Sequence, residues 1–124
     1  MKFQTLQWLS VALILGIGLI HLSMVPAEYE EAQYMGILFA INFLAAIIAA
    51  LGILRREVWG WVLGLVIAAG SIIGYILSRT VGLPGMEIEA WLQPLGLLSL
   101  VTEGLFLVLV LMMKPWASLE PTNQ

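Results

Sequence analysis

The 124-residue sequence contains no cysteine, a single histidine and only five basic residues. The lack of cysteine excludes disulfides, thiolate nucleophiles and sulfur-ligated metal clusters, and a single histidine excludes haem ligation by two histidines of one chain. Five scattered basic residues form no stripe that could follow nucleic acid phosphates, and no nucleotide-binding or serine hydrolase motif occurs. We therefore expect no nucleic acid partner, and the sequence identifies no cofactor.

Charged residues are also scarce, at 10% of the chain against roughly 25% in an ordinary soluble domain, while 61% of the residues are hydrophobic. Apolar runs of about 20 residues match a hydrocarbon core of roughly 30 Å. These runs cover residues 5–24, 34–54, 58–77 and 94–113. We predict that residues 1–124 form one all-α domain, an integral membrane protein folded as an antiparallel up-down-up-down four-helix transmembrane bundle.

The basic residues predict the orientation of these spans. Lys2, Arg55, Arg56 and Lys114 flank the ends that would share one side of the membrane, and the other two loops contain only Arg79. Because cytoplasmic loops are enriched in lysine and arginine, both termini are expected in the cytoplasm and the protein in the cell (plasma or inner) membrane. One alternative stays open: Lys2, the first apolar run and Val25-Pro26-Ala27 also fit a cleavable signal peptide.

The loops carry further predictions. Arg55-Arg56-Glu57 is short enough to require a tight antiparallel hairpin. HLSMVPAEYEEAQY, residues 21–34, is expected to be a solvated turn, since Pro26 should interrupt the first helix. The outer loop 78–93 contains the turn signal GLPG and then MEIEAWLQ, whose apolar residues could form a short interfacial helix.

Small residues recur at helical spacing in the third span, and in lipid such faces allow close helix association. One face carries Gly60, Gly64 and Ala68, and an adjacent face carries Gly70 and Gly74. Besides the lipid bilayer, the partners expected from these faces are a second copy of the chain or a larger membrane complex.

Polar residues of the spans collect in the outer half of the predicted bundle, while the inner half is almost dry. This distribution predicts a polar cavity that opens outward and is closed to the cytoplasm. The candidate ligand- or proton-binding residues are Glu103, His21, Asn42, Tyr75, Ser71 and Arg79. None of them is assigned a catalytic role.

Glu103 leads these candidates, because an ionisable side chain near mid-membrane costs at least ~2.5 kcal/mol and normally has a partner or a role. It is either a proton or cation site, or a protonated or Asn42-bonded carboxyl that fixes helix packing. His21 is either bonded to a backbone carbonyl or to Tyr75, or part of a nitrogen-and-carboxylate metal site with Glu28, Glu31 or Glu103. Arg79 is expected to pair with an outer glutamate.

The runs from His21 to Gly36, SRTVGLPG at 78–85 and EAWLQPLGLLSLVTE resemble small uncharacterised four-span membrane proteins of bacteria, which imply no particular activity. The small multidrug resistance transporters are a physical analogy, as four-span proteins with a membrane carboxylate. Theirs lies on the first helix, whereas Glu103 lies on the fourth.

Two functional classes follow. The first is a non-enzymatic accessory, scaffold or partner-binding membrane subunit. The second is a solute- or cation-binding or proton-coupled transport protein, with an outward cavity centred on Glu103. A metal- or cofactor-dependent enzyme is a minor third possibility.

Overall fold

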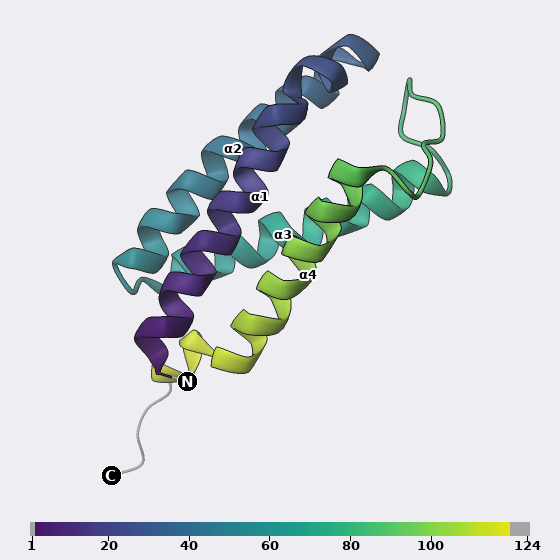
Figure 1. Cartoon of the computed structure of the whole chain (residues 1–124). Helices are drawn as coiled ribbons and strands as arrows, with labels where there is room; N and C mark the ends of the chain where they lie inside the picture. Colours follow the sequence, from purple (N-terminus) through teal and green to yellow (C-terminus); the bar gives the residue numbers. More distant parts are fainter. Residues whose placement is uncertain (1, 120–124) are drawn as a thin grey trace.

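The computed structural model describes residues 2–119, and all regular secondary structure in this range is helical. Its elements are α1 (Phe3–Glu31), α2 (Gln33–Leu54), α3 (Val58–Arg79), α4 (Pro94–Met113) and the short 3-10 helix η1 (Pro115–Leu119) (Figure 1). All four long helices are long and apolar enough to cross a membrane. The prediction of an all-helical protein with four membrane-length helices is therefore confirmed.

Helix α1 is longer than predicted. It continues through Pro26 to Glu31, so the solvated turn expected over residues 21–34 is wrong. Proline removes one backbone hydrogen bond but does not end a helix whose neighbouring residues favour it and whose outer turns are packed. Here Tyr29 packs so closely on Gly36 of α2 that a Cβ at Gly36 would lie 2.4 Å from the Tyr29 Cβ. Ala32 alone joins α1 to α2.

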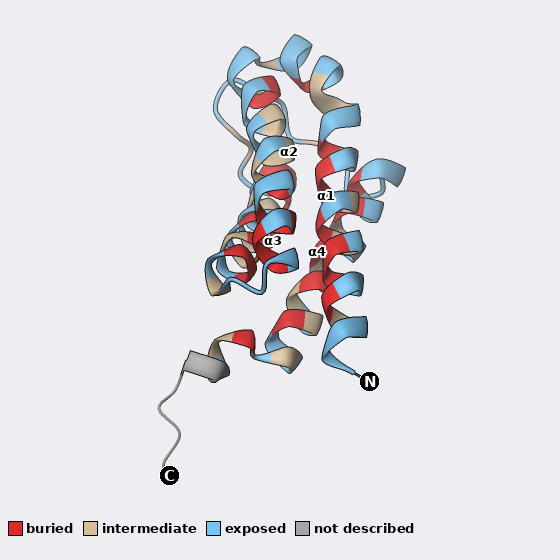
Figure 2. Ribbon diagram, turned by 90° about the vertical axis from the view of Figure 1, so that its left-hand side faces the viewer, coloured by how far each residue is buried: buried red, intermediate tan, exposed pale blue. Residues whose placement is uncertain are grey.

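The four helices form a ring, because each packs against the next along the chain and α4 packs back against α1. Between α1 and α2, Gln7 bonds to the carbonyl of Ile53 near the opposite end of its neighbour, and Gly18 faces Ala46. Figure 2 shows the buried residues gathered between the helices. The outward faces are apolar and exposed, as expected for surfaces in contact with lipid.

The turn between α2 and α3 confirms the predicted short hairpin. Arg56 adopts a left-handed conformation with φ of 56°, and its N–H donates to the carbonyl of Ile53. The N–H of Glu57 donates to the carbonyl of Gly52. These bonds occupy carbonyls that the end of α2 would otherwise leave unpaired.

The two small-residue faces of α3 have different surroundings. Gly60, Gly64 and Ala68 are buried within the single chain. A Cβ at Gly60 would lie 2.5 Å from backbone atoms of α2, and a Cβ at Gly64 would lie 2.5 Å from the Phe106 ring of α4. Gly70 and Gly74 line a cavity between the helices instead. The face of Gly60, Gly64 and Ala68 thus packs within the chain, and assembly with a partner stays a prediction.

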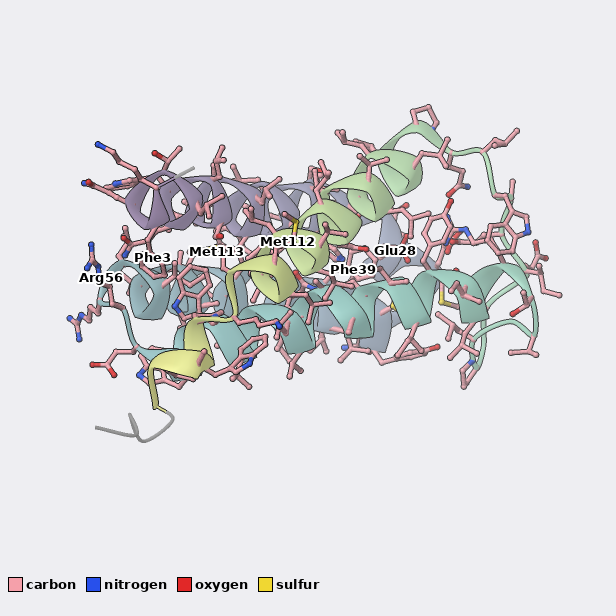
Figure 3. The ribbon with its side chains drawn as sticks, turned by 90° about the horizontal axis from the view of Figure 1, so that it is seen from below. Phe3, Glu28, Phe39, Arg56, Met112 and Met113 are labelled. Atoms are coloured by element: carbon pink, nitrogen blue, oxygen red, sulfur yellow. The ribbon has the colours of Figure 1, made fainter. Side chains whose placement is uncertain are left out.

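The bundle opens towards one end. Figure 1 shows α1 and α2 diverging from α3 and α4 towards the end that carries the segment 80–93. In Figure 3, Glu28 and Phe39 lie towards this end, whereas Phe3 and Arg56 lie at the opposite one. We refer to these as the outer and inner ends. The inner end is not fully dry, since Gln7 and Ser10 are buried there with hydrogen bonds inside the chain.

The segment 80–93 forms no helix, so the predicted interfacial helix is wrong. Its carbonyl groups are instead bonded by α3: Arg79 Nε donates to Ala90 and the Tyr75 hydroxyl donates to Trp91. The N–H of Glu89 donates to the carbonyl of Ser78. Because these bonds use backbone groups that a helix would need, the segment is held as an irregular loop across the outer end.

Candidate functional site

A cavity of about 480 Å³ lies between the four helices at the outer end, beneath the segment 80–93. All six residues proposed from the sequence line it: His21, Asn42, Ser71, Tyr75, Arg79 and Glu103. The structure therefore brings together residues that are as many as 82 positions apart in the sequence (103 − 21). Leu83, Met86 and Glu89 also line the cavity, so the outer segment forms part of its roof.

The deepest polar pair is formed by His21 of α1 and Glu103 of α4. Glu103 is 1% exposed, and its Oε1 accepts a hydrogen bond of 2.5 Å from the Ser99 hydroxyl. His21 Nδ1 lies 2.8 Å from the carbonyl oxygen of Ile17. Because a carbonyl only accepts, Nδ1 carries the hydrogen, and a neutral ring presents the lone pair of Nε2 to the cavity. Nε2 lies 4.0 Å from Glu103 Oε1.

These contacts bear on the alternatives that the sequence left open for His21 and Glu103. His21 is bonded to a backbone carbonyl, as one alternative stated, and it also faces Glu103. Glu103 is not bonded to Asn42, because its partner on α4 is Ser99. A helix residue and the serine one turn before it lie on the same face, which makes this bond a local one.

Asn42 links the two helices that lie on either side of the cavity. Its Nδ2 donates to Ser71 Oγ of α3 at 3.0 Å, while its Oδ1 is buried without a hydrogen-bond partner. A buried amide oxygen without a donor is unfavourable, and native structures contain few of them. This atom is therefore a place where a ligand or a water molecule would gain a hydrogen bond.

Arg79 and Tyr75 lie at the upper edge of the cavity. The Arg79 guanidinium is buried, forms an ion pair of 2.9 Å with Glu89, and stacks 3.8 Å above the Tyr75 ring. The prediction that Arg79 pairs with an outer glutamate is confirmed for Glu89. Gly96 of α4 makes this possible, because a Cβ there would lie 2.9 Å from the Tyr75 ring.

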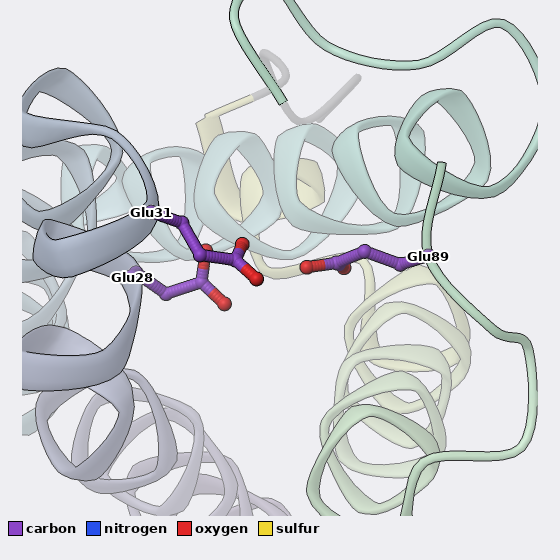
Figure 4. A group of neighbouring side chains, drawn as sticks. All are labelled: Glu28, Glu31 and Glu89. Atoms are coloured by element: carbon purple, nitrogen blue, oxygen red, sulfur yellow. The ribbon is translucent and has the colours of Figure 1, made fainter. Parts of the chain in front are cut away.

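Three carboxylates gather beside this ion pair. Ligand atoms of Glu28, Glu31 and Glu89 lie within 4.8 Å of one another, and Figure 4 shows the three side chains pointing together. Burial raises the pKa of Glu89; Arg79 opposes this rise and Glu31 adds to it. Glu28 and Glu31 of the predicted metal set thus lie together with Glu89, whereas His21 is not part of this group; whether any of these residues binds a metal stays a prediction.

Glu28 was expected to be solvated but is 8% exposed and lines the cavity. The continuous helix explains the difference, because Glu28 follows His21 by two turns and lies on the same face of α1. Sequence reasoning missed its burial by ending the helix at Pro26. The seven-residue spacing between His21 and Glu28 was the signal that could have found it.

No protein-family model, curated protein or solved structure matches this chain. The site therefore has to be interpreted from its own chemistry. It combines a buried acid, a histidine nitrogen, an unpaired amide oxygen and mainly apolar walls.

Proposed function

We propose that this membrane protein binds a small solute or cation in the cavity centred on Glu103. The observation that carries the proposal is the convergence of Glu103, His21 and the unpaired Asn42 oxygen on one cavity from three different helices. Buried polar groups in a membrane are costly, and such residues usually mark ligand or ion paths. The volume of about 480 Å³ lies within the roughly 300–1,000 Å³ typical of small-molecule sites.

The proposed setting is an up-down-up-down bundle in the cell membrane with both termini in the cytoplasm. The distribution of basic residues supports it: Arg55 and Arg56 lie at the inner end, and the outer end carries Arg79, which is held in an ion pair. In this orientation the cavity lies in the half of the bundle away from the cytoplasm. Coupling of ligand binding to proton uptake would use the His21–Glu103 pair.

The test compares small molecules that remain bound to the protein after its purification in lipid nanodiscs. Glu103→Gln removes the charge and keeps the shape, and Glu87→Gln is the matched control, since Glu87 is exposed and does not line the cavity. After denaturing extraction, mass spectrometry should detect a small molecule with the wild type and Glu87→Gln that is lost with Glu103→Gln. Identical extracts from all three proteins would contradict the proposal.

The other functional class, an accessory or partner-binding subunit, predicts a different result. In that case Glu103→Gln would change only the stability or the oligomeric state of the protein, with no loss of a small molecule. Thermal unfolding and size-exclusion chromatography of the same two variants provide these readouts.

A further inference from the structure

The hydrogen-bond donors that line the cavity are almost all committed to partners within the chain. Arg79 is the only lysine or arginine among the lining residues, and its nitrogens donate to Glu89, Ala90, Gln93 and Ser78. The hydroxyls of Tyr75, Ser78 and Ser99 donate to Trp91, Tyr75 and Glu103, respectively. The Ser71 hydroxyl accepts from Asn42 and keeps its own hydrogen available.

The acceptors, in contrast, are largely unpaired. Asn42 Oδ1 has no partner, and Glu103 receives a hydrogen bond on Oε1 alone. With its hydrogen on Nδ1, His21 offers the lone pair of Nε2. The buried carboxyl of Glu28 adds a fourth acceptor at the outer side of the cavity. A ligand that complements these groups has to donate hydrogen bonds, and a positive charge on it would pair with the carboxylate forms of Glu103 and Glu28.

The rest of the cavity lining is apolar and reaches the lateral surface of the bundle between α2 and α3. Leu38 and Ile41 of α2 are 52% and 53% exposed, Val66 of α3 is 63% exposed, and all three also line the cavity. Gly70 lies beside them on α3, and a Cβ there would have no atom within 4 Å. Because these residues lie within apolar helices of membrane length, we expect this side of the cavity to face lipid and not water.

Access from the outer end is more restricted. Leu83, Met86 and Glu89 of the outer segment line the cavity, and the Tyr34 hydroxyl of α2 donates a hydrogen bond to the carbonyl of Pro84. The segment is thus attached to both α2 and α3. The gap between α2 and α3 below it is the open side.

We propose that the ligand is an organic ammonium ion with an apolar chain, which reaches the cavity from the lipid through the gap between α2 and α3. Its N–H groups bond to Glu103, His21 and Asn42, and its chain lies along Leu38, Ile41 and Val66. This inference rests on the proposed function and specifies its ligand class. A free metal ion fits less well, since such an ion would not use the apolar side of the cavity.

The only histidine of the chain gives a specific readout, because ring ¹⁵N labelling of histidine reports on His21 alone. The labelled protein, without a histidine tag and in lipid nanodiscs, is titrated with octylammonium. Parallel titrations use octyltrimethylammonium, which has charge but no N–H, and octanoate, which has the opposite charge. Octylammonium should shift the His21 signals in a saturable way, octyltrimethylammonium should bind roughly tenfold more weakly or worse, and octanoate should not bind.

Two pairs of proteins test the site and the route. Glu103→Gln should weaken octylammonium binding by about tenfold or more relative to Glu87→Gln. Gly70→Leu places a side chain in the gap and should slow or abolish binding. Gly16→Leu is its matched control, because Gly16 is also helical with open space at its Cβ but does not line the cavity.

The outcomes separate the two proposals. Saturable, Glu103-dependent binding of octanoate, or equal binding of both ammonium ions, would overturn the ligand class while leaving a binding site in place. Octylammonium binding that Gly70→Leu and Gly16→Leu affect equally would overturn the lateral route. If no probe shifts His21 and the extracts of wild type and Glu103→Gln are identical, the proposed function itself fails.

Discussion

The Nε2 atom of His21 lies 4.0 Å from Oε1 of Glu103, and the opposite nitrogen of the same ring is bonded to the backbone carbonyl of Ile17. The backbone of α1 therefore fixes which nitrogen faces the acid. Beyond the Nδ1 hydrogen, the pair can hold one proton, either on the carboxyl group of Glu103 beside a neutral ring or on Nε2 of an imidazolium beside a carboxylate. A carboxylate facing an imidazolium is a charged pair, whereas a carboxyl group facing a neutral ring is not.

The first prediction concerns this tautomer. In its neutral form His21 should carry its hydrogen on Nδ1, because the Ile17 carbonyl accepts it at 2.8 Å. Ring ¹⁵N chemical shifts of the single histidine measure this directly. Glu103→Gln should leave the tautomer unchanged, since the backbone bond determines it. A neutral ring that is mainly protonated at Nε2 would contradict the structure.

The second prediction concerns the inner end, where α2 and α3 meet at Gly52 and Gly60. A Cβ at Gly60 would lie 2.5 Å from the backbone of Gly52 and Ile53, which cannot move aside as a flexible side chain could. Gly60→Ala should therefore lower the free energy of unfolding by about 1–3 kcal/mol. Gly74→Ala is the control, because its Cβ would meet nothing within 4 Å. Equal effects in reversible unfolding in detergent would show that the close approach is absent.

Much of this architecture could be predicted because it depends on local features of the sequence. The length of each apolar run predicts four membrane helices, and the spacing of polar residues such as Asn42 and Ser71 predicts that they face inward at a similar depth. The structure gives these two residues a direct hydrogen bond. Their assignment to one cavity needed only helix periodicity and the direction of each span.

What could not be predicted depends on contacts between distant segments. The end of α1 is decided by its packing on α2 and not by Pro26. The conformation of the segment 80–93 is decided by bonds from Arg79 and Tyr75, which no local pattern in MEIEAWLQ reveals. Gln7 was overlooked for the same reason, because its partners are 46 and 47 residues away.

The third prediction concerns the attachment of the outer segment. Arg79→Gln removes the ion pair with Glu89, so backbone amides of residues 80–93 should exchange hydrogen about tenfold faster or more, given about 1.5–3 kcal/mol for hydrogen bonds to charged groups. The amide of Glu89, which donates to Ser78, is the most direct reporter. Arg55→Gln, at an exposed position of the inner turn, is the control. Unchanged exchange in residues 80–93 would contradict the role of Arg79.

The fourth prediction concerns pH. Burial and the neighbouring Glu31 raise the pKa of Glu89 despite Arg79, so the folded protein holds this proton more tightly than the unfolded chain does. The contribution of Glu89 to stability is therefore present below the ordinary carboxyl pKa and is lost as pH rises through the raised value. As the pH rises from about 4 to about 8, the thermal stability of the wild type should fall relative to that of Glu89→Gln. A difference that grows in favour of the wild type would mean that attraction to Arg79 prevails.

The last prediction concerns Gln7, which joins α1 to the end of α2. Its Nε2 donates to the carbonyl of Leu54 at 3.3 Å and to that of Ile53 at 2.8 Å, which also accepts from the N–H of Arg56, so Gln7 adds a donor at the final turn of α2. Gln7→Leu keeps much of the volume but removes the donor, and should lower the free energy of unfolding by about 1–3 kcal/mol. Gln4→Leu, at an exposed position of the same helix, should change it little. Because Gln7 is far from the outer cavity, octylammonium should still shift the His21 signals in a folded Gln7→Leu protein, which separates loss of stability from loss of the site.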